Sequence, residues 1–437
     1  MLKRLLAIVV ALVVLVFLVV WFLGKSVTLE PNPDPIAFIG VSTPVTVAAR
    51  GPNGVKQFRA LVEQNGQSKV VFEDDSKSKQ PTRTYSFDIG NKKADFLKEG
   101  QAQVILEAMS NDLRGGQTQK TYTVQVVLHK PSVAADGLQH YINQGGSELV
   151  TFDINGLWSQ AGVKVGPYTI ASYAMPGQPD GSNHRFSLFP YPWDLSRDTE
   201  PVVFAQNAAG DRATATFWTK IFPKKFHEST ITLTDHLMQK IVSDIDPDGK
   251  IPGDLLQRYL YCNREMRKQN SKQLYDMRLK TAHEILWSGP FVRPPTKTES
   301  YFADRRSYVY NGKKVDEEVH LGFDLASTQH MPILAANSGK VIWADRLGIY
   351  GNCIVLDHGY GLQTIYGHMS RIDVKPGDMV KKSQQMGLSG QTGMAGGDHL
   401  HFSMQVDGIQ INPIEWWDDH WIQDRILSKI GSGAGKR

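Results

Sequence analysis

Residues 396–405, GGDHLHFSMQ, place two histidines at alternate positions of a run that otherwise has the pattern of a β-strand. Side chains at positions i and i+2 of a strand project to the same face, about 7 Å apart. His399 and His401 therefore face one space, with Leu400 and Phe402 alternating around them. Two imidazoles on one face, introduced by a Gly-Gly-Asp turn, predict either a metal site or a catalytic pair.

The surrounding strand- and turn-rich segment supplies partners for this pair. The stretch HLGFD sets His320 four residues before Asp324. Together with the distant histidine pair, these residues offer three metal ligands and one spare imidazole, the count that a catalytic zinc site requires. Imidazole also suits zinc better than magnesium or calcium. The residues alone leave open which imidazole does what, and any single histidine can equally be structural. We expect a structural role for His330, His358 and His420.

Five blocks of this segment follow one another in a known order: HLGFDLA, PILAANSGKVIWA, YGNCIVLDHGYGLQTIYGHMS, VKPGDMVKKSQQMGLSGQTG and GGDHLHF. Over about residues 300–415 the chain thereby resembles the LytM/lysostaphin-type zinc metallopeptidases, peptidase family M23. The resemblance implies one Zn²⁺ bound by His320, Asp324 and His401, with His368 and His399 as unligated catalytic histidines. It also implies a zinc metalloendopeptidase that hydrolyses peptidoglycan stem peptides at their cross-links.

The N-terminus predicts the compartment. Residues 5–24 form an unbroken apolar run, and twenty helical residues span about 30 Å, the thickness of a bilayer core. Bulky Trp21, Phe22 and Leu23 stand where a cleaved signal peptide, the alternative, would need small residues. We therefore expect residues 1–25 to be a single-pass anchor in a bacterial inner membrane. Positive charge before the span places the N-terminus in the cytoplasm and the bulk of the chain in the periplasm.

Between the anchor and the peptidase-like segment the hydrophobic period changes twice. Alternating runs separated by Gly, Pro and Asn predict two immunoglobulin-like β-sandwich modules, residues 26–130 and 131–222. Helical spacing predicts a short helical linker region over 223–295, and a peptidase domain with a C-terminal helix and tail follows over 296–437. The expected fold is thus multidomain and mainly β, ending in an antiparallel β metallopeptidase domain. For the two modules we expect a spacer role or a protein partner.

Composition excludes several classes of protein. The 21% of charged residues give a net charge of +4 and are interspersed, so we expect no nucleic-acid partner. Two cysteines, Cys262 and Cys353, are too few for a disulfide framework or a thiolate zinc site.

One acidic loop, residues 244–255, resembles the start of an EF-hand. Asp244, Asp246, Asp248 and Gly249 match its opening positions, but Leu255 replaces the bidentate glutamate at the twelfth. An Asp-rich turn that caps a helix explains the same residues, so calcium binding stays an open alternative.

Two other functions compete with the peptidase. Some members of the family that this chain resembles lack zinc ligands and activate a cell-wall amidase instead of cutting peptides. The intact His320, Asp324 and His401 argue against such a regulatory function here. SGKVIWA and VKPGDMVKKSQQMGLSG also resemble lipoyl-type carrier domains. The corresponding hairpin, LDHGYGLQ, has no lysine to modify, and a carrier leaves the histidines unexplained.

Overall fold

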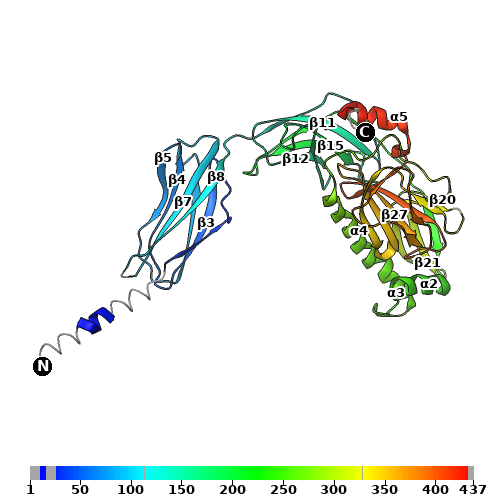
Figure 1. Cartoon of the computed structure of the whole chain (residues 1–437), viewed down its shortest axis with the longest axis horizontal. Coiled ribbons are helices and arrows are strands. Elements are labelled where there is room, and N and C mark those ends of the chain that lie inside the picture. Colours follow the sequence, from blue (N-terminus) through cyan, green and yellow to red (C-terminus); the bar gives the residue numbers. More distant parts are fainter. Residues whose placement is uncertain (1–9, 16–25, 113, 327, 432–437) are drawn as a thin grey trace. The chain divides into compact units, whose positions relative to one another are not determined.

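The computed structural model describes residues 10–15, 26–112, 114–326 and 328–431, and the protein is mainly β with few helices (Figure 1). The chain divides into two compact units: Met1–Pro131 with the short segments Gly156–Gln160 and Gln206–Ala213, and the remainder of the chain. Most of the predicted anchor, residues 1–25, lies outside the described residues. Within the described ranges no helix is long and apolar enough to span a membrane.

Two sheets enclose the core of the first unit. One contains β1 (Thr28–Asn32), β3 (Thr43–Arg50) and β6 (Thr82–Ile89); the other contains β2 (Phe38–Ile39), β8 (Gln117–Val126), β7 (Gly100–Ser110), β4 (Val55–Gln64) and β5 (Gln67–Asp74). Alternate side chains of these strands are buried, as the period of two requires. Phe58 and Tyr85 stack across the core with ring centroids 4.3 Å apart, so two facing sheets bury one apolar layer.

Ten short strands follow in the region of the second predicted module. They are β9 (Ser132–Ala135), β10 (His140–Asn143), β11 (Ser147–Asn155), β12 (Gln160–Val165), β13 (Tyr168–Ala171), β14 (Tyr173–Ala174), β15 (His184–Pro190), β16 (Val202–Gln206), β17 (Arg212–Thr216) and β18 (Thr219–Phe222). The sheet β14-β15-β11-β9 packs against the C-terminal part of the chain. Leu149 and Phe186 share one buried cluster with Tyr366 and Phe402, so this sheet has no separate core on that side.

The segment predicted to be helical begins with a strand. β19 (Glu228–Thr232) pairs in parallel with β21 (Asp304–Tyr310), and α2 (Asp235–Ile245) and α3 (Leu255–Tyr261) come next. A π-helical turn (Cys262–Met266), α4 (Arg267–Asp276) and a 3-10 turn (Met277–Lys280) continue α3. The prediction of a helical region over residues 223–295 is wrong beyond Lys280. There the backbone bonds to the turn around His358 instead, with Tyr360 donating to the Ala282 carbonyl.

The acidic loop between α2 and α3 is a capping turn whose carboxylates already have partners. Asp246 accepts from the backbone N–H groups of Lys250 and Ile251 and from Arg258, at 2.8, 2.9 and 2.9 Å. Asp244 accepts from Arg346 and from a backbone N–H. Because protein donors use these oxygens, the structure favours the capping explanation over the EF-hand.

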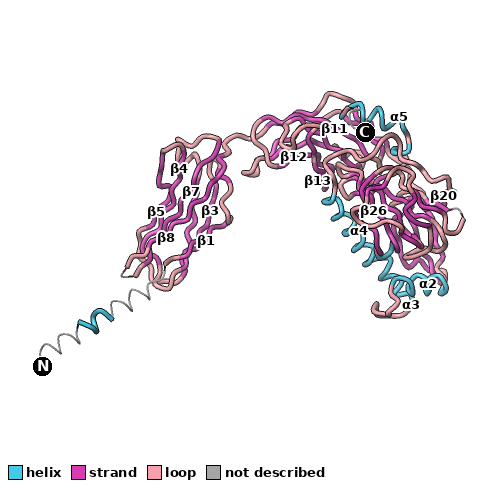
Figure 2. The backbone as a smooth tube through the Cα atoms, in the orientation of Figure 1, coloured by secondary structure: helices cyan, strands magenta, loops and turns pink. Residues whose placement is uncertain are grey.

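The C-terminal part is built on one large sheet in the order β20-β23-β31-β27-β26-β25-β29, and β32 (Ile409–Ile411) pairs with β31. Figure 2 shows this part as mostly strand, with β20 and β26 labelled in it. Its strands are β20 (Lys297–Ser300), β23 (Phe323–Ala326), β31 (Leu400–Val406), β27 (Leu362–Met369), β26 (Asn352–Asp357), β25 (Gly339–Arg346) and β29 (Met379–Val380). Smaller sheets contain β21 with β22 (Lys313–His320), and β24 (Pro332–Leu334) with β30 (Gln385–Leu388) and β28 (Arg371–Ile372). Every residue of β27 and β31 is buried, so these two central strands form a rigid support for any side chain they carry.

The chain closes with short helical turns, α5 (Asp419–Ile422), a π turn (Gln423–Leu427) and α6 (Ser428–Ile430). Ile422, Ile426 and Ile430 enter the same buried cluster as β31. The apolar spacing of these residues therefore attaches the terminal helix to the sheet.

Candidate metal centre and active site

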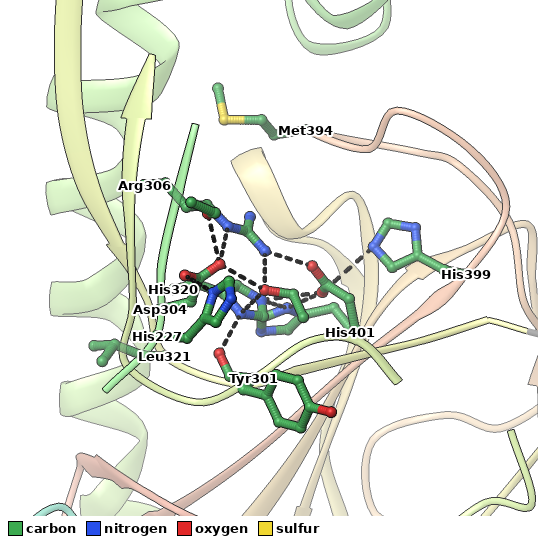
Figure 3. Close-up of polar contacts among 12 residues, drawn as sticks. His227, Tyr301, Asp304, Arg306, His320, Leu321, Met394, His399 and His401 are labelled. Carbon is green, nitrogen blue, oxygen red and sulfur yellow. Dashed lines mark hydrogen bonds and ion pairs between the residues drawn. The ribbon is translucent and has the colours of Figure 1, made fainter. Parts of the chain in front are cut away.

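Three strands bring His320, Asp324 and His401 to one point. Figure 3 shows His320 and His401 side by side there. His320 ends β22, and Asp324 on β23 pairs directly with His401 on β31 in the antiparallel ladder, so both side chains lie on the same face. Gly322 makes room for the histidine ring, because a Cβ at that position would lie 2.7 Å from the His401 imidazole. Among the described residues this is the one group of three or more potential ligands close enough to share an ion.

The three donor atoms form a compact triangle. His320 Nε2 lies 2.9 Å from His401 Nδ1 and 3.0 Å from Asp324 Oδ1, and His401 Nδ1 lies 3.1 Å from the same oxygen. A tetrahedral zinc ion with bonds of 2.0–2.1 Å separates its ligands by about 3.3 Å. Two nitrogens and one carboxylate oxygen at this spacing fit three corners of such a site.

Hydrogen bonds on the outer side of each imidazole fix which nitrogen faces the triangle. His320 Nδ1 donates to the Tyr301 carbonyl at 3.1 Å, which leaves Nε2 with its lone pair inward. His401 Nε2 lies 2.9 Å from Ser403 Oγ, whose own hydrogen is used on the Leu321 carbonyl at 2.7 Å. Ser403 therefore accepts, and His401 Nδ1 is free to act as a ligand.

The two remaining predicted histidines lie at the same site but outside the triangle. His399 Nε2 is 3.4 Å from Asp324 Oδ1, and its Nδ1 donates to the Gly397 carbonyl at 2.9 Å. The ring of His368 lies 4.8 Å from that of His399 and 5.7 Å from that of His401. Both rings line the same cavity as the three donor residues.

His368 reaches the site through an unusual backbone conformation. Gly367 is the residue paired with His401, so a regular pleat would point His368 to the opposite face. Instead His368 has φ +62°, and its Nδ1 donates to the Thr392 carbonyl at 2.8 Å. A left-handed conformation in a non-glycine residue costs of order 1–3 kcal/mol and is concentrated at functional sites.

The protonation states of these groups suit metal binding. Burial lowers the pKa of His320 and His368 and brings the pKa of His401 to about 4, so these rings are neutral. Burial alone would raise the pKa of Asp324, but the surrounding imidazoles of His320, His399 and His401 hold it well below its usual range. Burial opposes a charge on His399 as well, yet contact with Asp324 raises its pKa. Neutral imidazoles and an ionised carboxylate are the forms that bind a divalent cation.

The histidines expected to be structural lie apart from the triangle. His358 is fully buried between the Ser338 carbonyl and the Thr364 hydroxyl, at 2.7 and 2.8 Å. His330 and His420 have exposed side chains, 63% and 86% of each being accessible.

The site opens into a cavity of about 820 Å³ that the sequence did not predict. Its walls include Ser229 of β19, Leu237 of α2, Arg267 of α4 and Trp193 of the preceding β-module. Arg306 on β21 also lines it and contacts Asp324. No sequence signal marks these residues, because strands and helices far apart in the chain bring them to the site.

Comparisons with known proteins cover the segment that holds the site. Residues 318–413 match the model of Peptidase family M23. The chain is 36% identical over 96 residues to the peptidoglycan DD-endopeptidase ShyA of Vibrio cholerae, and 33% identical over 96 residues to the DD-carboxypeptidase/endopeptidase Mpg of Neisseria meningitidis serogroup B. Each match covers 22% of this chain and 22% of the relative, so the chain spans little more than a fifth of either relative's length.

Among solved structures, the catalytic domain of lysostaphin from Staphylococcus simulans is similar at 30% identity. The match covers 28% of this chain and 92% of that domain, with a TM-score of 0.24. The family match alone shows that the C-terminal part of this chain contains a peptidase M23 domain.

Proposed function

We propose that this protein is a zinc-dependent endopeptidase that hydrolyses peptide cross-links of peptidoglycan outside the cytoplasmic membrane. The observation that carries the proposal is the convergence of His320 Nε2, Asp324 Oδ1 and His401 Nδ1 within 3.1 Å of one another. The similarity to relatives named as peptidoglycan DD-endopeptidases supports the substrate class.

In this proposal His320, Asp324 and His401 hold one Zn²⁺ and leave a fourth position open. When bound, the ion supplies a Lewis acid that lowers the pKa of a water toward 7 and polarises the scissile carbonyl. The ladder pairing of Asp324 with His401 sets the ligand spacing without the slack of a loop.

His399 and His368 then divide the proton transfer and the stabilisation of charge between them. Each ring has its Nδ1 hydrogen engaged by a backbone carbonyl, so Nε2 is the atom directed to the reaction. One Nε2 accepts the proton of the attacking water, and the other, once protonated, hydrogen-bonds the developing oxyanion or the leaving amine. The proposal leaves the two assignments exchangeable.

We further propose that residues 1–25 anchor the chain in the inner membrane and that the β-modules position the peptidase in the periplasm. The unbroken apolar run at 5–24 supports the anchor. The alternative function, activation of a separate amidase without catalysis, requires none of the three donors and leaves their shared geometry without a purpose.

The test combines metal content with digestion of purified sacculi by the full-length protein. For His401→Ala we expect loss of both zinc and activity, because one of three ligands is removed. For His399→Ala we expect bound zinc to remain while turnover falls by about 10²–10⁴-fold, the usual contribution of a general base. His330→Ala, at an exposed histidine, is the matched control and should change neither.

Mass spectrometry of the released muropeptides identifies the bond that is cut. Full zinc and full activity in His401→Ala would refute the ligand assignment. Stoichiometric zinc in the wild type without any digestion product would support the regulator instead.

A further inference from the structure

We infer that Arg306 is a positioning residue that keeps Asp324 a one-oxygen metal ligand, and that strand β19 holds Arg306 in place from outside the family-matched segment. The inference rests on the proposed zinc site. It assigns a role to residues 227–229 and 300–306, all of which precede the matched residues 318–413.

The two oxygens of Asp324 have different partners. Oδ1 faces the triangle, 3.0 Å from His320 Nε2 and 3.1 Å from His401 Nδ1. Oδ2 accepts a hydrogen bond from Arg306 Nη2 at 2.7 Å. A carboxylate oxygen engaged by a guanidinium is withheld from the metal, so Arg306 limits Asp324 to Oδ1 and keeps a coordination position free for water.

Arg306 also reaches the second ligand, His320, through Ser300. Its Nη2 donates to Ser300 Oγ at 2.8 Å, and Ser300 Oγ lies 3.3 Å from His320 Nδ1. The hydroxyl hydrogen of Ser300 goes to Asp304 Oδ2 at 3.0 Å, so Ser300 accepts from Arg306 and shares the Nδ1 hydrogen of His320 with the Tyr301 carbonyl. One guanidinium nitrogen therefore orients both an oxygen ligand and an imidazole ligand.

Asp304 is the support on which this arrangement depends. It is buried, 3% exposed, and its Oδ2 lies 3.5 Å from Arg306 Nε. Two residues of the β19 segment converge on it: Ser229 Oγ donates to Oδ2 at 2.8 Å, and His227 Nδ1 lies 3.0 Å from Oδ1. In the parallel ladder Ser229 is the register partner of Arg306. Strand β19 therefore holds Asp304 in place, and Asp304 in turn orients Arg306.

Only arginine has the donors for this position. A guanidinium presents several N–H groups in one rigid plane, and here it contacts two carboxylates and one hydroxyl. A lysine could neutralise Asp324 but not hold Ser300 and Asp304 at the same time. The structure thus predicts that charge alone does not replace Arg306.

The first experiment compares Arg306→Met, Arg306→Lys and the matched control Arg305→Met in the full-length chain. Arg305 is the exposed neighbour on the same strand. The zinc dissociation constant is measured by competition with a chromogenic chelator. Because changes around metal ligands typically cost 10–100-fold in affinity, we expect a loss of that size for Arg306→Met, a smaller loss for Arg306→Lys, and none for Arg305→Met.

A second readout reports coordination directly. In Co²⁺-substituted protein the visible absorption is strong for four-coordinate metal and weaker when a fifth ligand joins. If Asp324 becomes bidentate in Arg306→Met, the absorption should fall while the wild type and Arg305→Met keep theirs. A merely structural role of Arg306 would lower the melting temperature without this spectral change.

The contribution of β19 is tested with Ser229→Ala against Thr230→Ala, the exposed neighbour on that strand. Ser229→Ala should weaken zinc binding measurably, and Thr230→Ala should not. If Arg306→Met does not fold, this pair of variants tests the inference in its place. Wild-type zinc affinity and cobalt spectra in Arg306→Met, or in both Arg306→Lys and Ser229→Ala, would overturn the inference. A wild-type protein that binds no zinc would instead overturn the proposed function itself.

Discussion

Replacement of Lys429 by methionine should loosen the attachment between the second β-module and the terminal helix. Lys429 Nζ on α6 lies 2.9 Å from Glu148 Oε1 on β11, and the two side chains are 4% and 0% exposed. At an effective dielectric constant of 20, two charges at this distance attract by about 6 kcal/mol, which desolvation of both ions largely offsets. Removing one partner leaves the other charge buried, and that typically costs about 3–5 kcal/mol.

Glu148 limits this cost by taking up a proton. Burial raises the pKa of Glu148 even beside Lys429, and in Lys429→Met only the Leu149 backbone N–H and the charge of Arg425 remain to oppose that effect. The protonated form is the one that burial favours, so stability is lost as the pH rises above the ordinary range of a glutamate. Lys429→Met should therefore be more destabilised at pH 8 than at pH 5.

Urea unfolding followed by tryptophan fluorescence measures the change, with Lys250→Met, at an 80% exposed lysine, as the control. We expect the control to change stability by less than about 0.5 kcal/mol. The double variant Glu148→Leu/Lys429→Met removes both charges of this buried pair, so most of the lost stability should return. A loss below about 1 kcal/mol in Lys429→Met, or no recovery in the double variant, would refute the argument.

Three further outcomes follow from individual side chains. Burial brings the pKa of His358 to about 4, so acid favours the unfolded state as the pH falls from about 6.5 to 4. In urea unfolding measured over this pH range, the wild type should lose about 2–3 kcal/mol more of its free energy of unfolding than His358→Gln. Equal losses in the two proteins would contradict this explanation. Ser403→Ala removes the acceptor that fixes the His401 tautomer, so chelator competition should show zinc affinity about tenfold lower, whereas unchanged affinity would assign Ser403 no such role. Millimolar Ca²⁺ should leave the melting temperature unchanged, because the carboxylate of Asp246 is already hydrogen-bonded within the protein. A melting temperature that rises with calcium would instead support calcium binding by the 244–255 loop.

The sequence was most informative where a local pattern and a strand period coincide. Alternation in the run around His399 and His401 predicted that both side chains share a face, and in the structure both rings lie beside Asp324. The period of strands also predicted the mainly β character of the protein. These inferences needed only the geometry of one element, which the residues of that element determine.

What the sequence did not reveal depends on contacts between distant segments. Nothing local marks Arg306 as a neighbour of Asp324, because β21 and β23 meet only in the folded sheet system. His368 faces the site through a positive φ that its residue type does not favour. β19 was taken for part of a helical region, since a five-residue strand followed by two amphipathic helices leaves little pattern of its own. The predicted helix beyond Lys280 gave way to tertiary hydrogen bonds, which override propensity.

The pairing of Asp324 with His401 restricts how this domain can change in length. Deleting or inserting one residue within β23 or β31 would turn one of the two side chains to the far side of the sheet, since neighbouring residues alternate between faces. Such a change abolishes the site outright, with no weakened intermediate form. Variation in length among functional descendants of this chain should therefore be confined to the connecting turns, while both strands keep their residue count.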